Sequence, residues 1–448
     1  MRLFPFINLT QLASAMALSA VLGTVLPAAG EGTPLQFSGA GWTQFGMIVS
    51  SLDTLQGKHL SGRAALSSGA QFGLAFKVSE DLGIEAGLGA VAGHSIAAQN
   101  TNGFYAPMGV TPYVSAASAK YTFWNSSGSE LNLKVGLFPY DYAPDAQNLG
   151  LYLVRGPVYP GFLMSGFETK YVMPVANMLG VQIHQQIGSV DHDVLFNVET
   201  DWYPYWDISP IYVINYKPTS AFRFGAGVNF NHFISIDKLL TSDTIAAVKY
   251  IEKTPVGVAF IEDTTLISFK GIKVMSNFSF DPKALIGDMP NMGPEDLKIY
   301  GEAAIIGIDN DKAHRQLYGE ISNRMPVMVG FNLPTFKKLD RLAFEVEHYG
   351  AKWADNPSIY NHTSGNKPTP IPLAPQDSNI STAKDDIKWS LYGSKTIHNH
   401  VKLSFQVASD HYRPGLFVGY GDNRPPDIHA VLLSPTDWYW TTKIAYFF

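Results

Sequence analysis

The stretch that decides the fold is "TDWYWTTKIAYFF", residues 436–448. Every second residue of this stretch lies on the same face of an extended chain: Trp440, Thr442, Ile444, Tyr446 and Phe448. The residues between them are mostly small or polar. A period of two predicts a β-strand rather than a helix. Chain ends usually fray and carry polar residues. This aromatic end therefore predicts a strand that places one face against an apolar environment.

The composition narrows the class of protein. Of the 448 residues, 16% are charged and 13% are aromatic, with 40 Gly and no Cys. Soluble chains usually carry about 25% charged residues, so this chain is poor in charge. The absence of Cys excludes disulfides, thiolate zinc sites and cysteine nucleophiles. A formal net charge of -6 argues against general nucleic-acid binding, which favours basic patches.

Residues 1–30 have the pattern of a secretory signal peptide. Arg2 is followed by no charge until Glu31, and the stretch ends in small residues up to Gly30. We expect cleavage near Gly30; the alternative is a retained membrane anchor. Beyond residue 30 no uninterrupted apolar run reaches the ~20 residues of a transmembrane helix. An exported chain of this kind either stays soluble or crosses a membrane as a closed barrel.

Alternation recurs through residues 31–448, which we interpret as one domain. "FRFGAGVNFNHF" (222–233) and "RLAFEVEHYG" (341–350) each separate an apolar parity from a polar or small one. About sixteen such segments can be counted. Their approximate spans are 36–50, 66–78, 82–93, 111–124, 129–138, 177–187, 191–201, 208–217, 220–233, 264–280, 296–308, 316–332, 339–353, 386–397, 399–412 and 437–448. Pro326 must lie at a bulge or strand end, because proline cannot donate to a central ladder.

Connections between these spans alternate in length. Most even-numbered ones are short turns, such as 188–190 and residue 398, whereas most odd-numbered ones are long, such as 139–176 and 354–385. Outer-membrane barrels have this arrangement, with short periplasmic turns and long external loops. A soluble sandwich gives no reason to sort loop lengths in this way.

The chain resembles bacterial outer-membrane β-barrel proteins in the size class of general and sugar porins. Three features carry this resemblance: the alternating strands, the signal peptide and the final "KIAYFF". The resemblance implies an all-β, transmembrane antiparallel barrel of about 16 strands (14–18), located in the outer membrane and surrounded by its lipid. It also implies that Ile444, Tyr446 and Phe448 form the signal that the barrel-assembly machinery reads. A homotrimer is possible by the same analogy.

The expected function is passive diffusion of small hydrophilic solutes, because a barrel of ~16 strands is wide enough for a water-filled lumen. Charges on the polar parity should face that lumen, since a charge facing lipid costs about 2–4 kcal/mol. The candidate pore charges are Lys134, Arg223, Lys298, Glu302, Glu345 and Glu347, with Glu85, Glu199, Lys388 and Lys402 as further wall charges. The alternative for each is a solvated wall residue without a role in selectivity.

The connection 139–176 is the candidate constriction loop, since the third loop of the porins it resembles folds into the lumen. Asp141, Asp145 and Arg155 would supply opposing charges, with Asp145 capping a short helix that runs to about Leu153. The expected flat walls for solute contact are Tyr140, Tyr142 and Tyr152. The alternative is an external loop packed on its own tyrosines.

Two further segments contain residues that could contact solute or cover the mouth of the barrel. "DWYPYWDISPIY" (201–212) contains Trp202 and Trp206, which are candidates for solute stacking or for an interfacial girdle. The segment 234–263 has apolar residues at helical spacing, which predicts a small helix over the mouth, or simple loop packing.

The sequence does not indicate an enzyme, a cofactor or a metal site. Asp191-His192-Asp193 and Asp410-His411 place acids beside histidines, but neighbours in a strand point to opposite faces. No G-x-S-x-G elbow occurs, and His398 with His400 is a weak metal signal. The alternatives to a channel are a surface-scaffold or adhesion barrel with a blocked lumen and, less well supported, a transporter for hydrophobic solutes.

Overall fold

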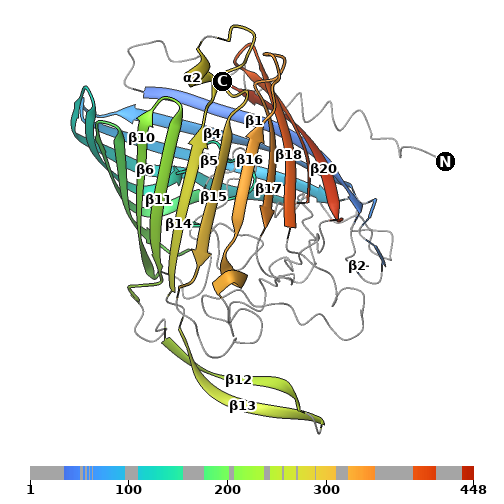
Figure 1. Ribbon diagram of the computed structural model, residues 1–448. Coiled ribbons are helices and arrows are strands. Elements are labelled where there is room, and N and C mark those ends of the chain that lie inside the picture. The colour runs from blue at the N-terminus through green and yellow to red at the C-terminus, as the bar shows by residue number, and fades with distance from the viewer. Residues whose placement is uncertain are drawn as a thin grey trace, which may run out of the picture.

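Sixteen antiparallel strands form one closed barrel (Figure 1). The computed structural model describes residues 35–50, 54–55, 58–59, 61–62, 64–95, 109–154, 176–200, 206–236, 243–254, 257–268, 271–287, 289–308, 321–348, 387–409 and 436–448. Each barrel strand pairs with its neighbour along the chain, and β1 closes the ring by pairing with both β4 and β20. The expected barrel of about 16 strands is therefore confirmed.

The strand bounds follow the predicted alternating spans closely. The first eight barrel strands are β1 (Leu35–Ser50), β4 (Ala64–Lys77), β5 (Leu82–Ser95), β6 (Gly109–Ser126), β7 (Ser129–Tyr140), β8 (Ala176–Ile187), β9 (Val190–Val198) and β10 (Ile208–Thr219). The other eight are β11 (Phe222–Asn231), β14 (Gly271–Phe280), β15 (Ile299–Ile306), β16 (Val327–Asn332), β17 (Arg341–His348), β18 (Ile387–Ile397), β19 (Val401–Ser409) and β20 (Trp438–Phe447). Outside the barrel lie the small pair β2 (Thr54–Leu55) and β3 (Lys58–His59) and the hairpin of β12 (Asp243–Thr254) and β13 (Gly257–Ser268).

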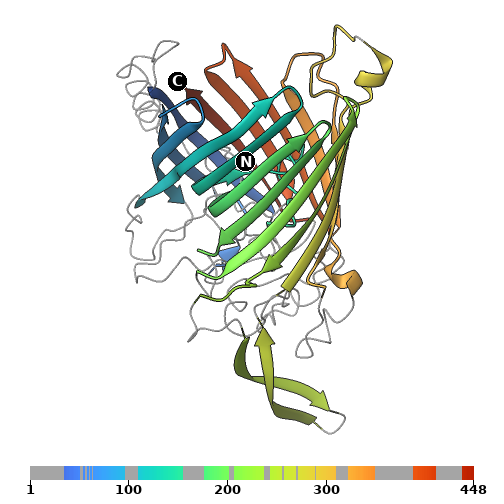
Figure 2. The ribbon, with the colours of Figure 1, turned by 90° about the vertical axis from the view of Figure 1, so that its left-hand side faces the viewer.

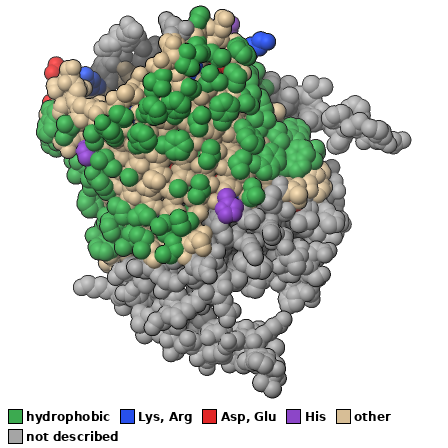
Figure 3. Space-filling view, in the orientation of Figure 1, with side chains coloured by type: hydrophobic (Ala, Val, Ile, Leu, Met, Phe, Trp, Pro, Cys, Tyr) green, Lys and Arg blue, Asp and Glu red, His purple; other side chains and the backbone are tan. Residues whose placement is uncertain are grey.

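Alternate side chains of each strand divide between the two faces of the wall. In β17, Glu345 and Glu347 are fully buried inside, whereas Phe344 is 42% exposed on the outside. Figure 3 shows the outer face over the middle strands covered by hydrophobic side chains, with the visible charged ones near its upper edge. Burying a wall carboxylate inside and exposing a phenylalanine outside suits a barrel whose outer surface meets hydrocarbon.

The last strand joins the first, and this explains the aromatic end of the described chain. Phe448 N–H donates to Gly39 O at 3.1 Å, and Gly39 N–H donates to Phe448 O at 2.9 Å. The Phe448 ring lies directly over Gly39, where an added Cβ would be 2.2 Å from the ring's Cζ. It also lies 6.0 Å from the Phe72 ring, centroid to centroid. Glycine is required here because only a bare Cα leaves room for the ring.

The connections sort by length between the two ends of the barrel. The turns 127–128, 188–189 and 220–221 lie at one end, which we call the short-turn end; the opposite end is the long-loop end. Figures 1 and 2 show the short helix α2 (Lys283–Ile286) at the short-turn end and the β12–β13 hairpin projecting from the opposite end. This arrangement confirms the parity of loop lengths expected from the sequence.

Three local predictions were wrong. The segment expected to form a helix within 234–263 instead contributes β12, which pairs in register with β13 from Asp243–Ser268 to Thr254–Gly257. Repeated β-branched residues in both strands, such as Thr244 and Val248, favour this pairing over a helix. The span 264–280 divides between β13 and β14, and the strand within 316–332 begins only at Val327.

Pro326 directly precedes β16, so its predicted place at a strand end is confirmed. Among the described residues, no helix is both long enough and apolar enough to cross a membrane. The predicted signal peptide, residues 1–30, lies outside the described residues.

Candidate constriction of the barrel lumen

The connection after β7 leaves the wall before the wall ends. Ala117 of β6 pairs with Leu137 of β7, which ends three residues later at Tyr140. From Ala117, β6 continues for eight residues to Gly109. The difference of five residues is about 17 Å of strand. Residues 141–154, which we call the constriction segment, therefore start below the rim at the long-loop end and lie inside the barrel.

Glu345 of β17 receives the middle of the constriction segment. Its Oε1 accepts the N–H of Gln147 at 2.6 Å, and its Oε2 accepts the N–H groups of Asn148 and Leu149 at 2.9 and 3.0 Å. Its Oε1 also accepts the Tyr300 hydroxyl at 2.8 Å. Hydrogen bonds to an ionised acceptor are worth about 1.5–3 kcal/mol each. Glu345 thus holds three successive residues of the segment against β17.

Two further carboxylates continue the same row. Glu302 of β15 accepts the N–H groups of Leu151 at 2.8 Å and Tyr152 at 2.9 Å, and Glu347 of β17 accepts that of Gly150 at 3.4 Å. Six consecutive backbone N–H groups, residues 147–152, therefore donate to wall carboxylates. We call Glu302, Glu345 and Glu347 the wall carboxylates.

This row of bonds explains why the helix expected from Asp145 to Leu153 does not form. That prediction was wrong: the described residues 141–154 contain turns and bends. Helical N–H groups need carbonyl partners four residues earlier, whereas here strand side chains take the N–H groups. Gly150 and Leu151 adopt φ values of 78° and 58°, which reverse the backbone inside the segment. Asp141, rather than Asp145, accepts a local N–H, from Ala143 at 2.8 Å.

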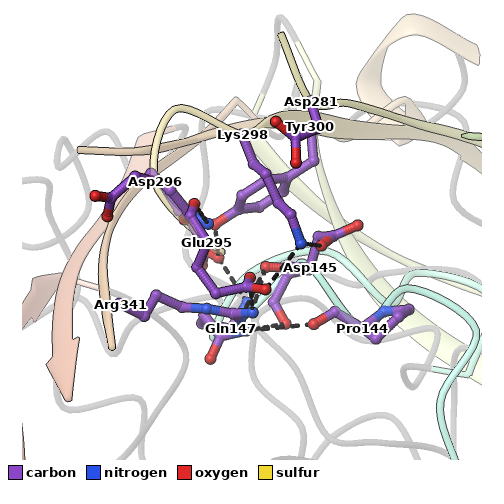
Figure 4. Close-up of polar contacts among 12 residues, drawn as sticks. Pro144, Asp145, Gln147, Asp281, Glu295, Asp296, Lys298, Tyr300 and Arg341 are labelled. Carbon is purple, nitrogen blue, oxygen red and sulfur yellow. Dashed lines mark hydrogen bonds and ion pairs between the residues drawn. The ribbon is translucent and has the colours of Figure 1, made fainter. Parts of the chain in front are cut away.

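Cationic side chains near the short-turn end hold the first half of the segment. Arg223, the second residue of β11, donates from Nη2 to Tyr142 O at 2.7 Å. Lys298, directly before β15, lies with Nζ 3.5 Å from Asp145 Oδ1 and 2.8 Å from Glu295 Oε1. Arg341 pairs with the same Glu295. Figure 4 shows Lys298 and Arg341 reaching Asp145, so the segment extends deep into the barrel.

An apolar cluster holds the other side of the segment. Tyr142 crosses the segment, donating its hydroxyl to Glu302 Oε1 at 2.7 Å and accepting the N–H of Leu153 at 3.0 Å. Leu149, Leu153 and Val154 are each no more than 1% exposed. The wall members of this apolar cluster are Phe138, Tyr140, Met178, Leu195, Ile211, Val213, Met275, Tyr300, Ala304, Ile306 and Met328. Part of the lumen is therefore packed rather than water-filled.

Burial inside the barrel shifts two pKa values in the segment. Burial raises the pKa of Asp141, although the hydrogen bond from Ala143 N–H and the charge of Arg223 act in the opposite direction. Burial and the neighbouring Glu302 carboxylate raise the pKa of Tyr142 well above its usual range. Tyr142 therefore remains a hydroxyl donor to Glu302 at any physiological pH.

Strands β5 and β7–β9 carry charge pairs that are more exposed than the wall carboxylates. Lys134 Nζ of β7 lies 3.3 Å from Glu85 Oε2 of β5, and the Glu85 side chain is 51% exposed. Next to them, His184 Nδ1 lies 2.9 Å from Asp193 Oδ1. The Glu85 side chain is therefore much more open to solvent than the wall carboxylates, which are at most 3% exposed.

The structure brings together most of the predicted pore charges. Arg223, Lys298 and the wall carboxylates all contact the constriction segment, whereas Lys134 pairs on another part of the wall. Tyr140, Tyr142 and Tyr152 are 5%, 3% and 0% exposed, so they lie within the apolar cluster and its edge. Trp206 is 60% exposed at the long-loop end. Arg155 and Trp202 lie outside the described residues.

The other wall candidates divide by burial. Glu199 and Lys388 are both fully buried, and Lys388 faces Glu347 in register across β17 and β18. Among the described residues, no group of His, Asp and Glu could hold a metal ion. Sequence reasoning missed Tyr300 and Arg341. Each lies an even number of residues from a predicted carboxylate of its own strand, so its side chain points to the same face. This spacing could have identified both residues from the sequence.

No protein-family model and no curated protein matches this chain. Among solved structures, the barrel is similar to a mutant of the porin from Rhodopseudomonas blastica, with 9% identity and a TM-score of 0.43 over 92% of this chain and 100% of that chain. It is also similar to Salmonella typhi OmpF in complex with daunomycin, with 11% identity and a TM-score of 0.46 over 92% and 97% of the two chains. Such distant similarities say nothing about solutes or partners, so the assignment of a porin-like barrel rests on the closed order of sixteen strands.

Proposed function

We propose that this chain is a bacterial outer-membrane channel through which small hydrophilic solutes diffuse passively. The observation that supports this most is the division of the wall: apolar side chains face outward, charged ones face inward, and a connecting segment lies inside. The chain would contact outer-membrane lipid, be inserted by the barrel-assembly machinery through Ile444, Tyr446 and Phe448, and need neither a cofactor nor catalytic residues. Assembly into a homotrimer is a further part of this proposal.

In this channel the wall carboxylates have a positioning role. They fix the constriction segment to β15 and β17, and solutes pass along the opposite side, past Lys134 and Glu85. Exposed opposing charges order water and bias ions in wide pores. Tyr140, Tyr142 and Tyr152 contact solute only if the segment moves, because the packed cluster buries them.

Swelling of liposomes that contain the purified, folded barrel tests the proposal. Neutral sugars of increasing size should enter at rates that fall steeply with size. Heat-modifiable migration on SDS gels provides the folding control. A folded barrel that admits none of the sugars would refute the channel.

A second candidate function is a surface-scaffold or adhesion barrel whose lumen is blocked. The apolar cluster inside the barrel is the observation that favours it, because packed side chains exclude water from that part of the lumen. The two functions differ in permeation alone: the scaffold predicts correct folding, no swelling and no conductance.

A further inference from the structure

We propose that the turn between β14 and β15, residues 281–298, carries a lipid anchor at its tip. Leu285 and Ile286 of α2 insert into the headgroup region of the phospholipid leaflet around the short-turn end of the barrel. Both residues are open to their surroundings, at 61% and 66% exposed, as is Val329 of the outer wall at 51%. The inference goes beyond the proposed function, because it needs the barrel to lie in a membrane but does not need permeation.

The tip continues an aromatic patch on the outer face of β11 and β14. Phe222 of β11 stacks on Phe280 of β14 with ring centroids 4.7 Å apart. Their neighbours Phe224 and Phe278 face each other in register and are 48% and 39% exposed. Leu285 follows Phe280 by five residues, so its Cα lies at most about 18 Å from the end of this patch. Figure 2 shows α2, drawn in yellow, beyond the outer edge of the wall rather than over the mouth of the barrel.

Polar contacts fix the base of the turn. Asp281 Oδ1 lies 2.9 Å from Lys283 Nζ, which also donates to Asp296 O. The Asp296 carboxylate accepts the N–H of Gly293 at 2.8 Å and the hydroxyl of Thr335, in the next turn at this end, at 2.9 Å. The charged side chain of α2 is therefore engaged at the base, and the rest of α2 presents exposed apolar side chains.

Lipid is the occupant that suits this tip. Leu285 and Ile286 are adjacent aliphatic side chains, which gain free energy on leaving water. Interfacial anchors bury their apolar face about 5–10 Å into the boundary between headgroups and acyl chains. The turn starts at that boundary, because β14 ends at Phe280 and its outer face meets hydrocarbon. The Asp281–Lys283 pair then lies among the headgroups, where charged groups remain solvated.

Fluorescent labelling of the full chain, which has no native Cys, tests the inference in phospholipid vesicles. Leu285→Cys carries the dye NBD at the tip. Glu80→Cys, exposed in the turn between β4 and β5 at the same end, is the matched control for water, and Val329→Cys on the outer face of β16 is the control for lipid. We expect nitroxide-labelled lipids to quench the dye at Leu285 and Val329 but not at Glu80. Iodide, present on both sides of the membrane, should quench the dye at Leu285 less than about half as strongly as at Glu80.

A second variant tests the cause. Ile286→Asp, added to the labelled Leu285→Cys chain, places a charge at the tip, so quenching by nitroxide lipids should fall and quenching by iodide should rise.

A dye at Leu285 that iodide quenches as it does at Glu80, with no quenching by nitroxide lipids, would overturn the inference. Shielding from both quenchers would also overturn it, because a second copy of the chain would then cover the tip. Quenching by nitroxide lipids at Val329 without quenching at Leu285 sinks this inference alone. Absence of that quenching at Val329 places the folded barrel outside the bilayer and sinks the proposed function as well.

Discussion

Deleting Phe448 should open the seam between the first and last strands at the short-turn end. Two backbone hydrogen bonds join Phe448 to Gly39, at 3.1 and 2.9 Å, and the Phe448 ring centroid lies 6.0 Å from that of Phe72 and 6.3 Å from that of Tyr446. A backbone hydrogen bond contributes about 0.5–1.5 kcal/mol net, and an aromatic pair about 0.5–1.5 kcal/mol. Two of each amount to about 2–6 kcal/mol.

Denaturant unfolding of the barrel in lipid vesicles measures this loss as a decrease in the free energy of unfolding. Phe448→Leu is the matched control, because it keeps both backbone bonds and loses only the ring pairs, so about 1–3 kcal/mol should be lost. Gly39→Ala should resemble that control, since its Cβ would lie 2.2 Å from Phe448 Cζ and displace the ring. A deletion that costs less than about 0.5 kcal/mol would show that the seam does not close through Phe448.

Three further predictions follow from the segment, the turns and the open wall. Gly150→Ala should destabilise the constriction segment by about 1–2 kcal/mol without lowering the stability of the barrel, because φ is 78° and the new Cβ would lie 2.8 Å from Met328 Cε. Amide hydrogen exchange in the segment should become faster, and unchanged exchange would contradict this prediction. The pKa of Asp296 is lowered, because hydrogen bonds led by the N–H of Gly293 outweigh the opposite effect of burial. The stability that the ionised Asp296 contributes is therefore complete above about pH 4 and is lost as the pH falls through the lower folded pKa. Asp296→Asn should make the melting temperature depend less on pH in the acid range, whereas a parallel shift of the whole curve would argue against this role. Lys134→Glu should move the reversal potential toward cation preference, because it replaces the cation 3.3 Å from Glu85 with an anion, and an unchanged potential would place this pair outside the conducting path.

The barrel could be predicted from sequence because its wall obeys a local rule. Alternation with a period of two, read one segment at a time, identified a span for every barrel strand and the inward direction of residues such as Glu345 and Arg223. Each strand turns one face to the lumen regardless of which strand it pairs with, so the alternation can be recognised without knowing the strand pairing. The faulty strand limits occurred where Pro326 and the hairpin before β14 interrupt that rule.

The interior of the barrel could be predicted only in part, because its contacts join distant residues. Leu149 N–H donates to Glu345, which is 196 positions away in the sequence, and no local sequence pattern predicts that hydrogen bond. Helical signals from Asp145 onward were overruled by acceptors on β15 and β17. Tyr152 is likewise buried in a cluster whose wall members come from seven strands, β7–β10 and β14–β16.

Single-channel conductance of the parent should be compared with that of a variant whose residues 143–152 are replaced by a short Gly-Ser linker. Both proteins should show stable conductance steps in planar bilayers, with larger steps for the variant because the constriction segment is gone. Silence from both folded proteins, or steps of the same size, would contradict a water-filled lumen narrowed by that segment.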